Sequence, residues 1–537
     1  MVASDEPIIR RLAPGALTFL VLGLVIGGAF FGLLRVAGTT DLRLFLDSPY
    51  VRRVVTFTIG QALLSTLLSV VPAIAVARAL ARRQAFPGRT LLLRLFGLPL
   101  VLPVLVGILG VVAVYGQSGW FNRLLAGLGA SPHQFLYGLP GILIAHVFFN
   151  LPLAVRLLLP VWTAIPGETW RLATQLGMSS SQVFRLIEWP LLRQVLPGVA
   201  GLVFMLCFTS FAIVLTLGGG PANSTIEVAI YQAVRFEFDL GKAIQLALLQ
   251  VFICGVLVAV GQRAIRHVPL TPTAQRAQDR PDVAALGGRL IDAVVLSLAA
   301  AFVLLPLAAV ALHGLAGPMH AVIGDPGLWR AAARTLAVAL SAGALATALG
   351  WSLLLTSREL RLRRGRPRPA AALETVASLV LVVPPLVIGT GLFALLNPVA
   401  DVLSLGILLV VVINALMGLP YVMRTLGPPM MRAGEQHDRL CASLGMVGWN
   451  RLRLVEWPLL RRPLGTALAL VAALAVGDLG IIALFGTQDT ATLPLLLYQR
   501  MAAYQLDAAA VTALLLAALC FGLFAVIERG IGGHGRG

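Results

Sequence analysis

The sequence predicts an all-α integral membrane protein with about twelve transmembrane helices in two homologous halves. Hydrophobic residues make up 58% of the 537 residues and charged residues only 12%, and the mean hydropathy is +0.90, values far from those of a soluble domain. Apolar runs of about 20 residues, long enough to cross a bilayer, recur along the chain. A polar segment also occurs twice, with corresponding residues 268 positions apart (445 − 177). A period this long indicates a tandem duplication.

The apolar runs give the expected order of spans. The first run is too long for a removable signal peptide and has no small-residue cleavage site, so it is predicted to be the first membrane helix. Asn397, Pro398 and Asp401 are the only break between the ninth and tenth spans. The spans are expected at about 13–36, 54–80, 91–115, 138–163, 197–217, 243–264, 289–312, 332–356, 372–397, 403–424, 464–486 and 508–528.

Arginine placement predicts the orientation. The loops after the second and eighth spans hold five and six arginines, against one acid, Glu359, and such loops stay in the cytoplasm. The connections at 218–242 and 487–507 are balanced or acidic and are expected outside. Both termini and the duplicated segment are then cytoplasmic. The polar stretch 267–288 is predicted to be a cytoplasmic linker between halves 1–266 and 289–537.

A net charge of +18 would suggest a nucleic-acid partner in a soluble protein. Here the arginines lie in short loops between apolar runs, without the interleaved aromatic side chains that stack on bases. The lipid bilayer is therefore the expected partner, and nucleic acid is not. The four cysteines and seven histidines show no ligand spacing, so the sequence predicts neither a metal site nor a disulfide framework.

The duplicated segments, 166–193 and 434–461, are too polar to lie in lipid. Their cores read LATQLGMSSSQVFRLIEWPLLR and LCASLGMVGWNRLRLVEWPLLR. Each is predicted to form two short amphipathic helices, with a turn at Gly177 or Gly445, a serine cap in the first copy, and a change of direction at Pro190 or Pro458. Two such hairpins on one side of the membrane predict two docking surfaces for a partner of matching two-fold symmetry.

These residues resemble the cytoplasmic signature of importer-type ABC transporter permeases: Glu-Ala-Ala, three residues, Gly, nine residues, Ile, any residue, Leu-Pro. Arginine replaces the opening glutamate in both copies, and tryptophan replaces the leucine. In that family the segment forms the coupling helix that docks on the ATP-binding subunit. The resemblance therefore assigns ATPase coupling to Arg171, Ala173, Gly177, Met178, Ile187 and Pro190, and to Arg439, Cys441, Gly445, Met446, Val455 and Pro458.

Two copies in one chain resemble the fused permeases of type I ABC importer architecture. This resemblance implies a bacterial inner membrane location, two copies of a cytoplasmic ABC ATP-binding subunit, and a periplasmic substrate-binding protein. The chain has no Walker A loop, and Lys242 is its only lysine, so it is expected to be no enzyme and to bind no cofactor. ATP and Mg²⁺ would be used by the partner subunit, and transport would proceed by alternating access.

The stretches 215–250 and 477–516 resemble the thiamine (and thiamine pyrophosphate) branch of this family. The fused iron(III) permeases share the architecture and a similar Gly-Gly-Gly-Pro loop, so iron(III) is the alternative substrate. An ion-coupled secondary transporter would also have two six-span halves, but it would need ionisable groups within the membrane and has no reason for twin amphipathic hairpins.

Polar residues within the spans are candidates for the translocation path. Asp478 lies between glycines in the eleventh span, where a carboxylate costs about 2.5 to 3.5 kcal/mol to insert. It could attract a thiazolium cation or simply accept hydrogen bonds from a broken helix. Its counterpart is Ser210 (478 − 268), and Asn150 and Asn414 are further candidates. Pro103 and the Pro384-Pro385 pair are expected to break the third and ninth spans.

Overall fold

The computed structural model describes residues 8–37, 45, 47–129, 131, 135–264, 280, 282, 286–446 and 448–532. In these residues all regular structure is helical, which confirms the all-α class. Eleven helices in the described part are long and apolar enough to cross a membrane. The ninth predicted span, 372–397, is not among them and forms a broken helix instead.

Packing divides the chain into two compact units that cut across the two predicted halves. One unit comprises residues 1–42, 230–251 and 318–537, and the other comprises 43–229 and 252–317. The first long helix of each half is thus packed into the unit that holds most of the other half. The predicted boundaries 1–266 and 289–537 concern homology rather than packing, and they stay a prediction.

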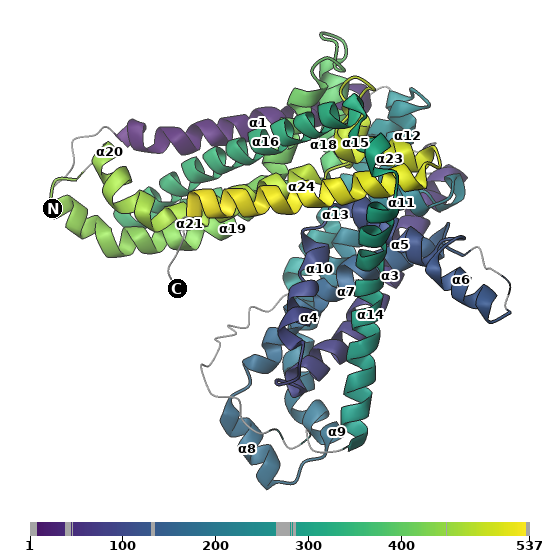
Figure 1. The fold of residues 1–537 in the computed structure, drawn as a ribbon. Coiled ribbons are helices and arrows are strands. Elements are labelled where there is room, and N and C mark those ends of the chain that lie inside the picture. Colours follow the sequence, from purple (N-terminus) through teal and green to yellow (C-terminus); the bar gives the residue numbers. More distant parts are fainter. Residues whose placement is uncertain are drawn as a thin grey trace. The chain divides into compact units, whose positions relative to one another are not determined.

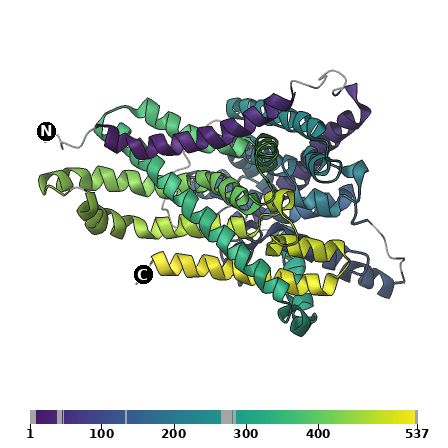
Figure 2. The ribbon, with the colours of Figure 1, turned by 90° about the horizontal axis from the view of Figure 1, so that it is seen from above.

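In the first of these units, α1 (Ile8–Ala37) runs beside α16 (Pro326–Arg358) and α18 (Pro385–Leu396) (Figures 1 and 2). A Cβ atom placed on Gly391 would lie 2.4 Å from the Ala29 carbonyl oxygen, so only glycine allows α18 to approach α1 this closely. Small residues commonly bring helices together in this way in membranes. The bundle is completed by α19 (Gly406–Ser443), α21 (Trp457–Val476) and α24 (Leu506–Gly532).

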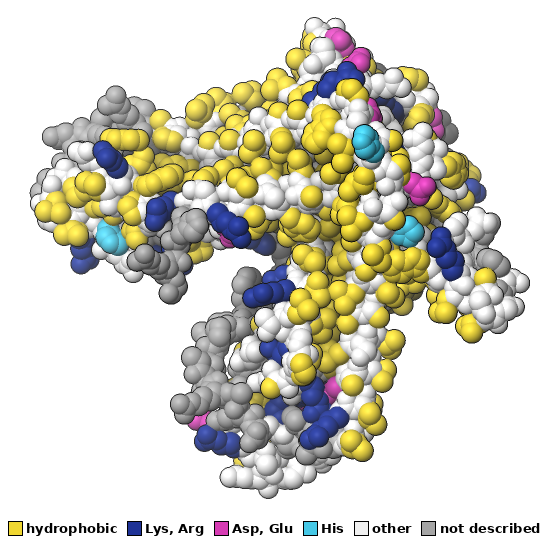
Figure 3. All heavy atoms as spheres, viewed as in Figure 1, with side chains coloured by type: hydrophobic (Ala, Val, Ile, Leu, Met, Phe, Trp, Pro, Cys, Tyr) yellow, Lys and Arg dark blue, Asp and Glu magenta, His cyan; other side chains and the backbone are white. Residues whose placement is uncertain are grey.

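The other unit repeats this arrangement. Its bundle contains α3 (Pro49–Arg82), α5 (Val104–Tyr115), α7 (Leu139–Thr163) and α10 (Trp189–Phe208), and α14 (Leu286–Ala316) packs on α5 and α3. A Cβ atom on Gly110 of α5 would lie 2.5 Å from the Pro306 carbonyl oxygen of α14. Hydrophobic side chains cover much of the drawn face of α14 (Figure 3). Leu290, Leu298 and Leu305 of this helix are exposed, as expected for a helix that faces lipid.

Proline breaks the third and ninth spans, as predicted. The third comprises α4 (Arg89–Leu95), the 3₁₀ turn η1 (Leu98–Leu100) and α5, and the ninth comprises α17 (Pro367–Leu379), η6 (Val380–Val382) and α18. Pro103 and Pro384 precede α5 and α18 with ψ angles of 132° and 141°. Proline has no amide hydrogen to continue a helix, and its extended ψ starts a new one.

The fifth and eleventh spans also differ from the prediction. The expected spans 197–217 and 464–486 are interrupted, because α10 ends at Phe208 and α21 at Val476, and short helices follow as α11 (Ala212–Leu217) and α22 (Gly480–Phe485). Apolar content measures composition and not backbone continuity, so these breaks were missed. The expected outer connections hold short helices as well, α12 (Ile226–Arg235) and α23 (Leu493–Ala502). The remaining elements outside the duplicated segments are α6 (Trp120–Gly127), η3 (Pro221–Asn223), α13 (Leu240–Ala264), α15 (Met319–Ile323) and the π-helical turn η5 (Glu359–Arg363).

Candidate coupling site and transmembrane polar residues

The predicted turns of the duplicated segments occur at the two glycines. In the first copy, α8 (Gly167–Gln175) ends in a turn where Gly177 has φ +58°, and Gly445 has φ +62° after α19 in the second. The Met178 amide donates to the Ala173 carbonyl at 3.0 Å, and the Gly177 amide donates to the Thr174 carbonyl at 3.1 Å. This pair of bonds is the Schellman motif, which requires a left-handed residue at its centre.

The second copy forms the same motif. The Met446 amide donates to the Cys441 carbonyl at 2.8 Å, and the Gly445 amide donates to the Ala442 carbonyl at 3.3 Å. Cys441 is buried, as is its counterpart Ala173. The duplicated Leu-Gly-Met sequence therefore specifies a backbone shape.

The chain that follows each turn was predicted only in part. Ser179 caps α9 (Ser180–Val183) in a capping box with Gln182, as the serine run suggested. The prediction that Pro190 and Pro458 redirect the chain is wrong. From α9 the helix continues through a π-helical turn, η2 (Phe184–Glu188), into α10, and from α20 (Gly448–Arg451) through η7 (Leu452–Glu456) into α21. A π turn inserts one extra residue before the proline, and this relieves the clash of its ring with the preceding turn.

The first helices of the two segments also differ. Pro166 separates α7 from α8, whereas its counterpart Gly434 lies inside α19, a single helix of 38 residues. The predicted pair of short helices is therefore found in neither copy: α8 of the first copy is a separate short helix, but the helix after each turn runs on into a transmembrane helix. In the second, the coupling segment is the direct extension of a transmembrane helix.

Both segments expose the same apolar side chains. Leu172, Leu176 and Leu186 are 56%, 68% and 62% exposed, and their counterparts Leu440, Leu444 and Leu454 are 55%, 64% and 63% exposed. Trp189 and Trp457 are likewise exposed. We call these two sets of four residues the apolar docking surfaces. Exposed leucines at matching positions in two otherwise polar segments are typical of binding surfaces.

The other coupling residues surround these surfaces. Arg171 and Arg439 are exposed, Ile187 and Val455 are half-buried, and Pro190 and Pro458 lie at the starts of α10 and α21. Figure 3 shows arginine side chains toward the ends of the bundles that carry these segments.

A buried ion pair, which the sequence analysis missed, attaches each segment to its own bundle. Glu188 is 0% exposed and accepts a hydrogen bond from Arg78 Nε of α3 at 2.6 Å. Glu456 is 5% exposed and accepts one from Arg358 Nη2 of α16 at 2.8 Å. The signal was the glutamate of the repeated Glu-Trp-Pro sequence. A buried carboxylate needs such a partner, and removing the partner is strongly destabilising.

The candidate path residues fall into two groups. Asp478 lies in the break between α21 and α22, where Oδ1 accepts from the Gly480 amide and Oδ2 from Asn414 Nδ2, both at 3.1 Å. In the other unit, Asn150 Nδ2 donates to Cys207 Sγ at 3.3 Å, and Ser210 lies in the corresponding break between α10 and α11. Asp478 and Asn414 thus meet, as do Asn150 and Cys207. Their role in a translocation path stays a prediction.

Comparison with known proteins agrees with this architecture. A family model described as "Binding-protein-dependent transport system inner membrane component" matches residues 348–531. The chain is 45% identical over 531 residues to the thiamine transport system permease protein of Escherichia coli (strain K12), and the match covers 98% of each chain. The chain belongs to this family of permeases. It is a multi-pass inner-membrane protein.

Two further relatives extend the match. The permease is 43% identical to the thiamine transport system permease protein of Salmonella typhimurium over the full length of both. It is 28% identical to the sulfate transport system permease protein CysW of Synechocystis, over 47% of this chain and 96% of that one. A relative of half the length is consistent with a fused, duplicated permease.

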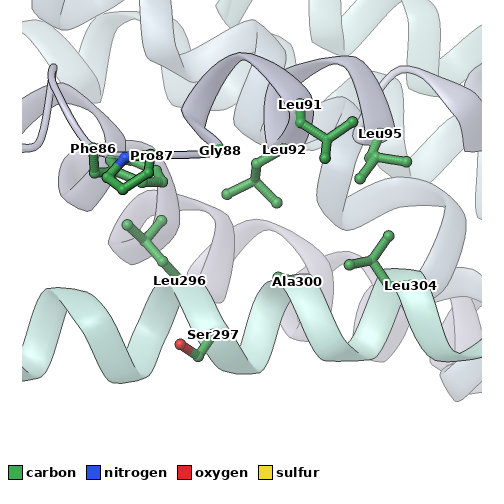
Figure 4. Close-up of a pocket in the computed structure, with 10 residues that line it drawn as sticks. All are labelled: Phe86, Pro87, Gly88, Leu91, Leu92, Leu95, Leu296, Ser297, Ala300 and Leu304. Carbon is green, nitrogen blue, oxygen red and sulfur yellow. The ribbon is translucent and has the colours of Figure 1, made fainter.

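An apolar pocket of about 230 Å³ lies between α4 and α14 of the permease (Figure 4). Phe86, Leu91 and Leu95 line one side, and Leu296 and Leu304 line the other. Ser297 is the one hydroxyl among its ten lining residues, and none of them is charged. This pocket therefore offers nothing that would select a cation.

All four cysteines of the permease are buried. Among the described residues, no three His, Cys, Asp or Glu side chains are grouped as a metal site would need. The expectation that the permease binds no metal stays a prediction.

Proposed function

We propose that the permease is the membrane-spanning subunit of an ATP-driven importer of thiamine and its phosphate esters. The observation that carries this proposal is the 45% identity over 98% of both chains to a thiamine transport permease. A match of this extent includes both duplicated segments and the stretches 215–250 and 477–516.

The two apolar docking surfaces would each receive one copy of a cytoplasmic ABC ATP-binding subunit. Their leucines have the same exposure in the two copies, so two identical subunits can bind them in the same way. This arrangement supports a cytoplasmic location for the segments and for both termini. ATP and Mg²⁺ would then belong to the partner, and a periplasmic binding protein would deliver the substrate to the opposite side.

The drive mechanism follows from how the segments are attached. When the ATP-binding subunits close, they would move the docking surfaces, and the continuous helices through η2 and η7 would carry that motion into α10 and α21. The buried pairs Arg78–Glu188 and Arg358–Glu456 would carry it into α3 and α16. Rigid packed elements with two arrangements are the usual basis of such alternating access.

Within the membrane, Asp478 is the candidate contact for the positively charged thiazolium ring. The Gly480 amide and Asn414 hold its carboxylate in the helix break. Asn414 thus positions the carboxylate and does not neutralise it. This role for Asp478 in the permease, and those of Ser210 and Asn150, are part of the proposal.

The test is uptake of labelled thiamine by cells that lack the gene, with and without a plasmid copy, beside uptake of labelled thiamine pyrophosphate and ferric iron. We expect thiamine uptake to depend on the plasmid and iron uptake to be unaffected. Iron uptake that depended on the gene, with thiamine uptake unchanged, would overturn the substrate. Transport by the lone chain in proteoliposomes, driven by an ion gradient, would overturn the ATP-driven mechanism.

A further inference from the structure

The two coupling segments hold their buried glutamates with different sets of residues. In the second copy all but one member of the set lies within the duplicated segment. Arg451 Nε donates to Glu456 Oε1 at 2.9 Å, and Arg451 also pairs with Asp438. Arg358 of α16 adds the second guanidinium on Glu456. Asp438, Arg451 and Glu456 all belong to the duplicated segment itself.

The first copy lacks counterparts of Asp438 and Arg451. The position of Arg451 is taken by Val183 (451 − 268), and that of Asp438 by Trp170 (438 − 268). Both are apolar and buried. Glu188, the counterpart of Glu456, is nevertheless 0% exposed, so its charge needs another cation besides Arg78.

Arg280, from the stretch predicted to be the linker between the halves, supplies that cation. It pairs with Glu188 Oε1 through Nη2, and its guanidinium lies over the Trp170 ring at 4.2 Å from the centroid. The Arg280 side chain is only 4% exposed. The ring that replaces Asp438 therefore holds the guanidinium that replaces Arg451, through a cation–π contact.

Asp282 supplies the missing acid. Its side chain is 0% exposed, and its Oδ1 lies 3.1 Å from Arg280 Nε. Asp282 Oδ2 also lies 3.7 Å from Arg78 and 3.8 Å from Arg82, both on α3. Arg280 and Asp282 thus give Glu188 a second guanidinium with an acid partner of its own, as Arg451 and Asp438 do for Glu456.

We propose that Arg280 and Asp282 form a clamp that completes the first coupling segment from the linker, in place of the two residues that the second segment carries within its own sequence. For its effect on transport this inference rests on the proposed coupling function. Its structural content does not rest on that function: beside the arginine of its own bundle, the first segment is held by two residues of the connection between the halves, and the second by two residues of its own sequence. Arg280 and Asp282 are positioning residues.

Hydrogen–deuterium exchange on the purified full-length permease tests the clamp without any partner. In Arg280→Gln with Asp282→Asn, we expect amides in 170–190 to exchange roughly tenfold or more faster and those in 438–458 to be unchanged, since the buried carboxylate of Glu188 has lost one of its two cationic partners. Arg451→Gln is the matched variant, and we expect the reverse pattern. Arg52→Gln, which removes an exposed pair with Asp47, is the charge control and should change neither region.

Two additional variants separate the clamp from a general loss of folding. Trp170→Asp with Val183→Arg, added to the linker double variant, gives the first segment the residues of the second and should restore slow exchange in 170–190. Glu188→Gln should shrink the effect of Arg280→Gln, because the two changes act on one contact. Unchanged exchange in 170–190 on removal of Arg280 and Asp282 would overturn the proposal. An effect of Arg280→Gln that is the same in the native chain and in the Glu188→Gln variant would also overturn it.

Binding of the ATP-binding subunit provides the second readout. We expect the linker double variant to weaken binding and the Trp170→Asp, Val183→Arg background to recover it. If exchange changes as expected but binding does not, the clamp stands and the proposed coupling role of the first segment fails. If exchange does not change, the clamp fails whatever the binding result.

Discussion

Replacement of Gly177 offers a measurable test of the coupling turn. The residue has φ +58°, and a Cβ atom placed on it would meet no heavy atom within 4 Å. The cost of a side chain there is therefore backbone strain and not a clash. For an L-residue in the left-handed region this strain is roughly 1–2 kcal/mol, enough to shift the balance between the native turn and others by about 5- to 30-fold.

We therefore expect Gly177→Val to weaken binding of the ATP-binding subunit about 5- to 30-fold, with the permease still inserted and stable. Gly177→Asn is the matched control, because asparagine tolerates the left-handed region and should bind nearly as well as the native chain. The same pair of changes at Gly445, with φ +62° and equally open space, should give the same ranking.

The assay is the dissociation constant of the permease in nanodiscs for the purified ATP-binding subunit, followed by thiamine uptake in cells. Native affinity in Gly177→Val would refute the argument that the turn shapes the docking surface. Equal losses of affinity in Gly177→Val and Gly177→Asn would also refute this argument, because they would show that the ATP-binding subunit contacts Gly177 directly.

Three further predictions concern the buried pair, the membrane carboxylate and the helix crossing. Arg358→Met should lower the free energy of unfolding by about 3–5 kcal/mol, because Glu456 is left buried with one partner fewer. Chemical denaturation measures this change. Adding Glu456→Leu should recover most of the lost stability, because the buried charge is then removed as well. Asp478→Asn should raise the KM for thiamine uptake more than it lowers the maximal rate. Native kinetics in Asp478→Asn would remove it from the path. Gly391→Leu should separate α1 from α18 and lower the Tm of the purified permease. Gly27→Leu is the control and should leave the Tm unchanged, because a Cβ atom on Gly27 meets nothing within 4 Å. Equal Tm values for the two variants would contradict the close crossing of α1 and α18.

The sequence alone predicted those features that depend on local chemistry. Leu-Gly-Met predicted the turn at Gly177, the serine run predicted the cap at Ser179, and Pro384 predicted a helix break. Each follows from the conformational limits of one or two residues. The helical class followed from composition, since a chain this apolar must satisfy its backbone hydrogen bonds within helices in lipid.

The remaining features depend on contacts between distant residues. Arg280 and Glu188 are 92 residues apart in the chain, and an arginine in a polar linker looks like any other solvated charge. The π-helical turns also left no signal, because proline after Glu-Trp normally indicates a bend. The placement of α1 and α14 was equally hidden, since a uniformly apolar helix does not show which neighbour it will contact.

The placement of α1 has a consequence for how the chain is made. Its main packing partners begin with α16 at Pro326, 289 residues after α1 ends at Ala37 (326 − 37). At translation rates of about 5–20 residues per second, α1 waits roughly 15–60 s in the bilayer before its first partner is synthesised. By contrast α14 finds α3 and α5 already in place when it emerges. Although α1 precedes these partners in the chain, it is thus among the last helices to be packed, and the face that will contact α16 and α18 is open to lipid, chaperones and proteases in the interval.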